Sequence, residues 1–217
     1  MLKDWSNVII PEKEEINERL EKARNRLVQQ QILIMQKKLP VLVSFDGWGA
    51  AVKGSILGKI IKNIDPRFFK VAVMDKPTED EKRRPFIYRY VINIPEAGKF
   101  TFMDGGCLDE VTKQKLSGKI TDEEYKRKIE SVKRFERQLS DNGYLVIKFF
   151  FHIGEQEQRK RLTRLLDDKN TRWRVSEYDL WQNQHYKKSL KAFDQFIDDT
   201  SQSIAPWYIV DATDKKW

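Results

Sequence analysis

The sequence has few of the residues that build disulfide frameworks and metal clusters. Its 217 residues include one cysteine, Cys107, and two histidines, which excludes an internal disulfide framework and a cysteine-based zinc site. Long hydrophobic runs are also absent: the longest strongly apolar stretch, 144–153, contains Lys148, and it is half the length of about 20 residues that a membrane-spanning helix needs. The N-terminal residues lack a signal pattern, so we expect a cytoplasmic protein without membrane contacts.

The chain does contain enough apolar material for a folded core, together with an excess of positive charge. Hydrophobic residues make up 40% and aromatic residues 12% of the sequence, and the length fits one domain. Lysine and arginine total 41 against 33 acidic residues, which gives a net charge of +8. Such a charge favours polyanionic partners. Nucleic acid ranks last among them because no nucleic-acid-binding motif is recognised, and we expect no nucleic-acid partner.

Short apolar runs separated by helical patterns predict a parallel α/β sheet. The runs lack a strict alternation of polar and apolar residues, which is typical of strands covered on both faces. Helices between successive strands predict a three-layer fold around a five-stranded parallel sheet. The expected strands are 41–45, 69–74, 99–103, 144–153 and 206–210.

Several stretches between these strands have the spacing of helices. Residues 11–38 are predicted to form one long helix, because Pro11 suits a first turn and Pro40 ends the pattern. Thr121 and Glu124 predict a capping box at the start of a helix over 121–142. The other expected helices are 55–63, most of 79–94 despite Pro85, and two within 154–200. Helical spacing in the first helix predicts a buried stripe formed by Ile16, Leu20, Ala23, Leu27, Gln30 and Ile34.

A glycine-containing loop with a lysine follows the first expected strand. Such a loop can bind phosphate, because backbone N–H groups and the start of the next helix face the anion and the lysine adds a positive charge. Gly47 and Lys53 fit the pattern G-x-x-x-x-G-K-[ST], whereas Val52 and Gly54 replace its second glycine and its Ser or Thr. Spacing alone leaves two alternatives open: a phosphate loop, or an ordinary turn with a solvated lysine.

Longer segments resemble the polyphosphate kinase 2 family, which includes polyphosphate:AMP and polyphosphate:ADP phosphotransferases. The loop segment FDGWGAAVKG is similar to the family's FEGWDAAGKG, and RWRVS followed by Asp179 is similar to the R-W-K-x-S/T-x-x-D of the family's lid. The matches run in the family's order from about residue 12 to the end of the chain. The segments that carry the resemblance are 45–54, 65–67, 77–82, 88–90, 135–139, 146–153, 172–176 and 205–215.

The resemblance implies a single domain over residues 1–217 with a P-loop kinase-like fold. The N-terminal helix would lie within 1–40, a helical lid and the following helix would span about 154–200, and the family's final C-terminal helix would be absent. The implied activity moves a phosphoryl group between inorganic polyphosphate and a nucleoside mono- or diphosphate (AMP, ADP or GDP), with magnesium as cofactor. The implied protein partner is a homo-oligomer or a second domain of the same family.

The resemblance also implies roles for individual residues. Lys53 would neutralise charge at the transferring phosphoryl group, and Asp104 would position the metal, so these two are the candidate catalytic residues. Candidate ligands for phosphate or nucleotide are Lys53 together with Gly47, Ala51, Gly54, Ser55, Arg172 and Arg174. Candidate residues of a polyphosphate channel are Arg67, Lys82 and Arg89.

Departures from the family's motifs leave the activity open. Gly49 stands where the family's loop has an aspartate, Val52 replaces the loop glycine, and Gly105 stands where the motif D-R-S-W-Y has its arginine. Phosphoryl transfer depends on positioning and on charge neutralisation, and one such loss can reduce the rate on the order of 100–1000-fold. The alternatives are an active phosphotransferase and a catalytically degenerate domain, such as one half of a fused pair, with a structural or polyphosphate-binding role.

Overall fold

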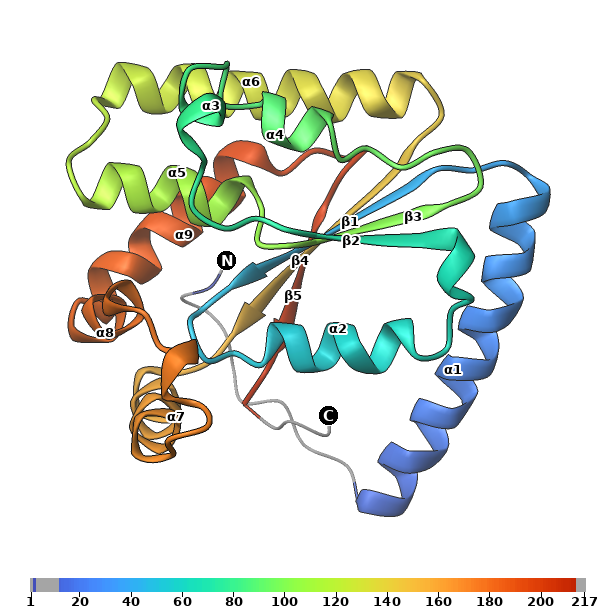
Figure 1. Cartoon of the computed structure of the whole chain (residues 1–217), viewed down its shortest axis with the longest axis horizontal. Helices are drawn as coiled ribbons and strands as arrows, with labels where there is room; N and C mark the ends of the chain where they lie inside the picture. Colours follow the sequence, from blue (N-terminus) through green and yellow to red (C-terminus); the bar gives the residue numbers. More distant parts are fainter. Residues whose placement is uncertain (1, 3–11, 214–217) are drawn as a thin grey trace.

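A five-stranded sheet, parallel throughout, lies at the centre of the part of the chain that the structure describes (Figure 1). The structure is a computed structural model, and it describes Leu2 and residues 12–213. The strands are β1 (Val41–Gly47), β2 (Phe69–Val73), β3 (Phe100–Asp104), β4 (Leu145–His152) and β5 (Trp207–Asp211). Their order is β2-β3-β1-β4-β5, with β1 paired to both β3 and β4. The predicted five-stranded parallel sheet is therefore confirmed.

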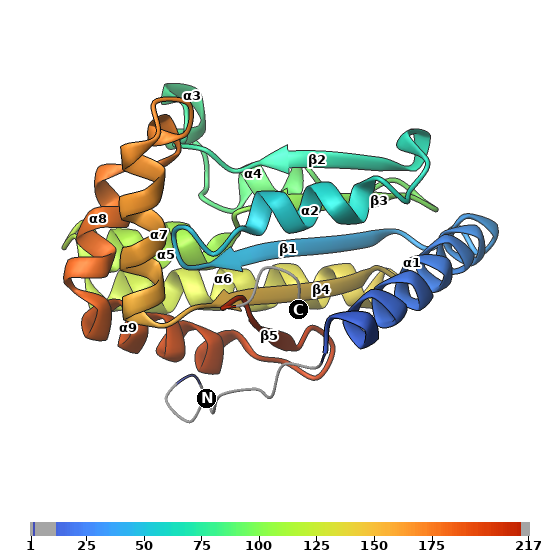
Figure 2. The ribbon, with the colours of Figure 1, turned by 90° about the horizontal axis from the view of Figure 1, so that it is seen from below.

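Helices cover both faces of this sheet, as the predicted three-layer fold requires. Figure 1 shows α2 on one face and α5, α6 and α9 on the other. Figure 2 shows α7 and α8 at the edge where the strands end. The helices are α1 (Lys13–Gln36), α2 (Lys53–Ile61), α3 (Glu79–Lys82), α4 (Tyr88–Val91), α5 (Cys107–Leu116), α6 (Asp122–Asp141), α7 (Glu155–Asp167), α8 (Glu177–Gln184) and α9 (Tyr186–Thr200).

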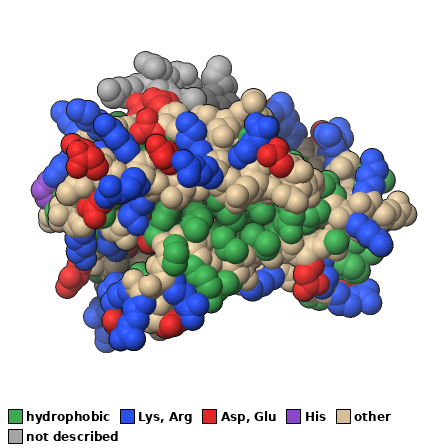
Figure 3. All heavy atoms as spheres, turned by 90° about the horizontal axis from the view of Figure 1, so that it is seen from above, with side chains coloured by type: hydrophobic (Ala, Val, Ile, Leu, Met, Phe, Trp, Pro, Cys, Tyr) green, Lys and Arg blue, Asp and Glu red, His purple; other side chains and the backbone are tan. Residues whose placement is uncertain are grey.

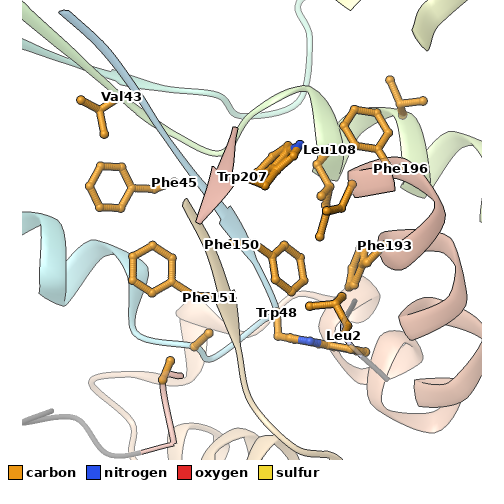
Figure 4. Packing of buried hydrophobic residues seen from close by; sticks show 14 of the residues in the cluster. Leu2, Val43, Phe45, Trp48, Leu108, Phe150, Phe151, Phe193, Phe196 and Trp207 are labelled. Carbon is orange, nitrogen blue, oxygen red and sulfur yellow. The ribbon is translucent and has the colours of Figure 1, made fainter. Parts of the chain in front are cut away.

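Aromatic side chains from the sheet and from α9 form the core (Figure 4). Phe45 of β1 stacks on Phe151 of β4 with ring centroids 5.6 Å apart. On the other face of the sheet, Phe150 packs edge-on against Phe193 of α9 at 5.4 Å. Such contacts on both faces explain why the central strands lack polar alternation.

Helix α1 is less buried than its sequence pattern predicts. It begins at Lys13, and the predicted start at Pro11 lies outside the described residues. Of the predicted stripe, Ile16 is buried, Leu27 and Ile34 are partly buried, and Leu20, Ala23 and Gln30 are exposed. Figure 1 shows that α1 runs across the end of the sheet where the strands begin, so only part of the helix faces the body. The prediction of a continuous buried stripe was therefore wrong.

Three other segments differ from their predicted structure. Residues 79–94 form the two short helices α3 and α4, because Pro85 lies between them and cannot continue a helix. The sequence pattern did not predict α5, in which Leu108, Val111 and Thr112 make a short buried face among charged residues. The region 154–200 contains the three helices α7, α8 and α9 rather than two, with a short 3-10 helix at Arg172–Arg174.

The face of the molecule seen from above carries basic and acidic side chains around a central hydrophobic area (Figure 3). Lysine and arginine are interspersed with aspartate and glutamate on this face. None of the helices within residues 12–213 is long and apolar enough to cross a bilayer.

Candidate phosphate-binding site

The loop between β1 and α2 turns sharply through backbone conformations that favour glycine. Gly47 has a φ of +139°, and a Cβ at this position would lie 2.7 Å from the backbone nitrogen of Phe151, so only glycine fits there. Val52 adopts the left-handed region with a φ of +58°, which β-branched residues rarely enter. The loop therefore keeps a tight turn even though valine replaces the second glycine of the pattern.

The Lys53 ammonium group lies against this loop. Its Nζ donates hydrogen bonds to the carbonyl oxygens of Gly47 (3.0 Å) and Trp48 (3.3 Å), and it lies 3.9 Å from Oδ2 of Asp109. The side chain is 17% exposed. The structure thus places the positive charge at the carboxyl end of β1 and the start of α2. Of the other predicted loop ligands, Gly54 and Ser55 are exposed and Ala51 is buried.

Asp46 precedes the loop and is fully buried. Its Oδ1 accepts hydrogen bonds from the backbone N–H groups of Gly106 (2.9 Å) and Asp109 (3.4 Å) at the start of α5, and the Ser44 hydroxyl donates to its Oδ2. Burial raises the pKa of Asp46, while these hydrogen bonds and Lys53 lower it. A Cβ on Gly106 would lie 2.9 Å from Cγ of Asp46, so this glycine lets the carboxylate bind the N-terminus of α5.

Two further carboxylates, those of Asp104 and Asp109, lie near the start of α2. Asp104 ends β3, and its Oδ2 is 3.7 Å from the position that a Cβ on Gly54 would take, so β3 brings it to the start of α2. The side chain of Asp109 is 36% exposed. Its partial burial is the chief cause that raises its pKa to about 7, and neighbouring carboxylates add to this rise while Lys53 opposes it. Sequence reasoning found Asp104 but missed Asp46 and Asp109. The aspartate in the matching segment FDGW was the available signal for Asp46.

Trp48 anchors the loop in the core. It is fully buried, stacks on Tyr186 with ring centroids 4.1 Å apart and donates a hydrogen bond from Nε1 to Nδ1 of His152 (3.2 Å). His152 is thus a packed, hydrogen-bonded histidine. Because the indole packs between β4 and α9, it fixes the position of the backbone on which Lys53 rests.

The predicted lid arginines lie on a surface beside α8. Arg172 and Arg174 are exposed in the 3-10 helix that joins α7 to α8, and the Arg174 guanidinium lies over the ring of Trp173 at 5.3 Å. Trp173 itself is 76% exposed. The turn thus presents two basic groups and an aromatic ring to solvent.

The predicted channel residues have different environments. Arg67 is exposed and pairs with Asp65 (2.6 Å), and Lys82 is exposed and pairs with Glu79. Arg89 is buried, donates to the carbonyl oxygen of Asp75 (2.5 Å) and lies 3.3 Å from Glu110. The structure therefore does not bring Arg89 to an exposed channel, because its guanidinium joins α4 to the segment after β2 and to α5.

Arg161 of α7 joins the loop to the end of β5, and sequence reasoning missed it. Its guanidinium donates to the carbonyl oxygens of Ala50 (3.3 Å), Ala212 (2.8 Å) and Thr213 (2.6 Å). The side chain is 6% exposed and pairs with Glu157 at 2.6 Å. Because these carbonyl oxygens come from two segments distant in sequence from Arg161, no local pattern around Arg161 indicates them.

A parallel α/β sheet with a lysine-bearing loop after its central strand defines the class of phosphate-binding α/β proteins. Comparison with known proteins narrows this class. The sequence pattern of the Polyphosphate kinase 2 family matches residues 11–217, and the chain belongs to that family. A solved structure, Polyphosphate Kinase 2 from Arthrobacter aurescens TC1, superposes with a TM-score of 0.90 at 25% sequence identity, covering 98% of this chain and 77% of that one. The predicted family and fold are thus confirmed.

Two curated relatives carry more specific names. A Polyphosphate:AMP phosphotransferase of Pseudomonas syringae is 30% identical over 181 residues, which cover 83% of this chain and 36% of the relative. An AMP/ADP-polyphosphate phosphotransferase of Meiothermus ruber is 28% identical over 202 residues, covering 93% of this chain and 73% of the relative. The chain thus spans about a third of the length of the first relative.

Proposed function

We propose that this chain is a phosphotransferase domain that moves a phosphoryl group between inorganic polyphosphate and a nucleoside mono- or diphosphate. The observation that carries the proposal is the position of Lys53, whose ammonium rests on the loop carbonyls at the carboxyl end of the central strand. Ligands of open α/β sheets bind at this edge. The names of the relatives, which act on polyphosphate with AMP or ADP, support the substrate class.

Lys53 would exchange its hydrogen bonds with the loop for contacts with phosphate oxygens. The transition state of phosphoryl transfer spreads negative charge over the transferred group, so a nearby ammonium stabilises it. Arg172 and Arg174 would then bind the same phosphates in two-pronged fashion from the lid. This division of roles needs the exposed turn of Arg172 and Arg174, which precedes α8, to move over the loop when the substrates are bound.

Magnesium fits the oxygen donors around Lys53. The rise in the pKa of Asp109 to about 7 reflects burial and several carboxylates gathered there, and such a surplus of negative charge suits a cation. No group of three or more His, Cys, Asp or Glu side chains within the described residues is placed to hold a metal alone. In nucleotide sites, however, magnesium takes one or two carboxylates and completes its coordination with phosphate oxygens and water. Asp104 is the residue that would hold it.

A second candidate function is polyphosphate binding without turnover, in support of an active partner domain. Gly49 and Gly105 favour it, because neither position carries the charged side chain that the family's motif has there. The presence of Lys53 and Asp104 favours the first candidate, an active phosphotransferase. The two candidates predict the same binding and differ in turnover.

Turnover of AMP, ADP and GDP with polyphosphate and magnesium separates the two candidates. An active domain produces ADP, ATP or GTP at a rate that Lys53→Ala lowers on the order of 100-fold or more, while Lys62→Ala at the exposed end of the same helix leaves the rate unchanged. Polyphosphate binding without product above the background of the Lys53→Ala variant would support the second candidate. Neither binding nor turnover would contradict both.

A further inference from the structure

The backbone conformation of Gly49 does not explain why this position is a glycine. Unlike Gly47, it does not adopt a positive φ, so an alanine could take the same backbone conformation. A Cβ at position 49 would, however, collide with Oδ1 of Asp179 and lie 2.9 Å from its Cγ and 3.1 Å from its Cβ. The position of α8 therefore requires that residue 49 have no side chain.

Both backbone polar groups of Gly49 are bound by side chains of α7 and α8. The N–H of Gly49 donates to Oε1 of Gln182 (3.0 Å), and Nε2 of Gln158 donates to the carbonyl oxygen of Gly49 (3.3 Å) and to Oε1 of Gln182 (2.7 Å). Asn183 extends the network by donating to Oε1 of Gln158 (3.0 Å). The two glutamines are 0% and 2% exposed, and a buried, satisfied network of this kind favours one geometry.

The Asp179 carboxylate is held in a fixed orientation at the same place. Its Oδ2 accepts hydrogen bonds from the backbone N–H (2.8 Å) and the hydroxyl (2.7 Å) of Ser176 in the capping box of α8. Its Oδ1 faces the position that a side chain on residue 49 would occupy. The carboxylate thus comes to the loop from α8, in the space that residue 49 leaves empty.

We propose that Gly49 is the docking seat of the lid, and that Asp179 is a positioning residue that packs into it. Contact at this seat, formed by Gly49, Asp179 and Gln182, locks α8 onto the loop and places the turn of Arg172 and Arg174 beside it. The glycine that replaces the loop aspartate then has a role of its own, because it lets the lid pack against the loop. This inference does not depend on turnover, so it can hold or fail independently of the proposed phosphotransferase activity.

A double-mutant cycle read by amide hydrogen exchange tests the seat on the full chain, without nucleotide, polyphosphate or magnesium. We expect Gly49→Ala to speed exchange in α8 on the order of tenfold or more, since overpacking at the seat disfavours the docked lid. In an Asp179→Ala background the same change should alter exchange less than about twofold, because Oδ1 and Cγ are gone and only the 3.1 Å contact with Cβ is left. In an Asp179→Asn background the full effect should return, because the amide fills the same space.

The matched control is Gly58→Ala, since no atom lies within 4 Å of a Cβ at that position. We expect it to leave exchange in α8 unchanged. Exchange in β1 and β4 reports on the core in every variant, so local release of α8 is distinguished from global unfolding. Parent-like exchange in Gly49→Ala, or an equal increase with and without the Asp179 side chain, would overturn the proposal.

Discussion

At the scale of single residues, burial decides how much a charged pair contributes to the free energy of unfolding. Nζ of Lys148 in β4 donates to both carboxylate oxygens of Glu136 in α6 (2.8 and 2.9 Å) and to the carbonyl oxygen of Thr200 (3.0 Å). The two side chains are 4% and 6% exposed. Arg137 and Asp141 form an equally short pair (2.9 Å) in the same helix, but they are 64% and 57% exposed. Water screens the second pair and not the first.

We therefore expect Lys148→Met to be strongly destabilising. It leaves the Glu136 carboxylate buried without its cation, and breaking a buried pair in this way costs about 3–5 kcal/mol. Arg137→Met, the matched exposed change, should cost at most about 1 kcal/mol. Urea unfolding of both variants measures the difference, and similar losses of stability in the two would contradict the account.

Asp109 should make stability depend on pH. Its pKa is raised from 3.8 to about 7 in the folded chain, so between these values the folded state binds more protons than the unfolded state. Stability must then fall as pH rises from about 4 to 7. Without added magnesium, Asp109→Asn should gain about 1 kcal/mol or less over the parent at pH 8, since the carboxylate is 36% exposed and partly screened.

Urea unfolding of parent and Asp109→Asn at several pH values tests this expectation. The gain of the variant should shrink toward pH 4 and disappear below about pH 3, where the parent carboxyl is protonated in both states. A gain that is constant from pH 4 to pH 8 would show that the effect is not one of charge.

At the scale of elements, local sequence determines where several helices begin. Thr121 accepts a hydrogen bond from the N–H of Glu124 (3.2 Å), and the Glu124 carboxylate accepts one from the N–H of Thr121 (2.7 Å), as the capping box predicted. Similar boxes begin α3 at Thr78 and α8 at Ser176. Each box satisfies N–H groups that the first helical turn leaves without partners.

Thr121→Ala should therefore destabilise α6 by about 1 kcal/mol, because the cap is lost. Ser131→Ala is the matched control: its hydroxyl bonds to the carbonyl oxygen of Arg127 within the same helix, a contact that adds little to helix stability. Thermal unfolding of the two variants gives the comparison. A Ser131→Ala loss as large as that of Thr121→Ala would contradict the capping argument.

At the scale of the whole molecule, the sheet was the most predictable part. Its strands are apolar runs separated by helices, so the sequence pattern predicted all five strands and their parallel arrangement. Helix α5 was missed because its buried face is short and lies among charged residues. The stripe on α1 was predicted as buried because spacing shows which residues share a face, but it does not show whether another element covers that face.

The sequence predicted the site residues only where they belong to one local motif. Lys53 and Asp104 follow strand ends, and the structure brings both to the start of α2. The contacts of Gly49 with Asp179 and Gln182, and those of Arg161 with the end of β5, join residues distant in sequence. Such contacts follow from the folded arrangement, and no local pattern indicates them.

Polyphosphate binding by the full chain tests most directly the claim that Lys53 serves an anion site on the loop. In a calorimetric titration at low salt, the parent should bind, and Lys53→Ala should weaken binding at least about tenfold because a charge-assisted contact is lost. Lys62→Ala, at the other end of α2, should change it less than about twofold, and added salt should weaken binding to the parent. Equal binding by the parent and Lys53→Ala would contradict the account.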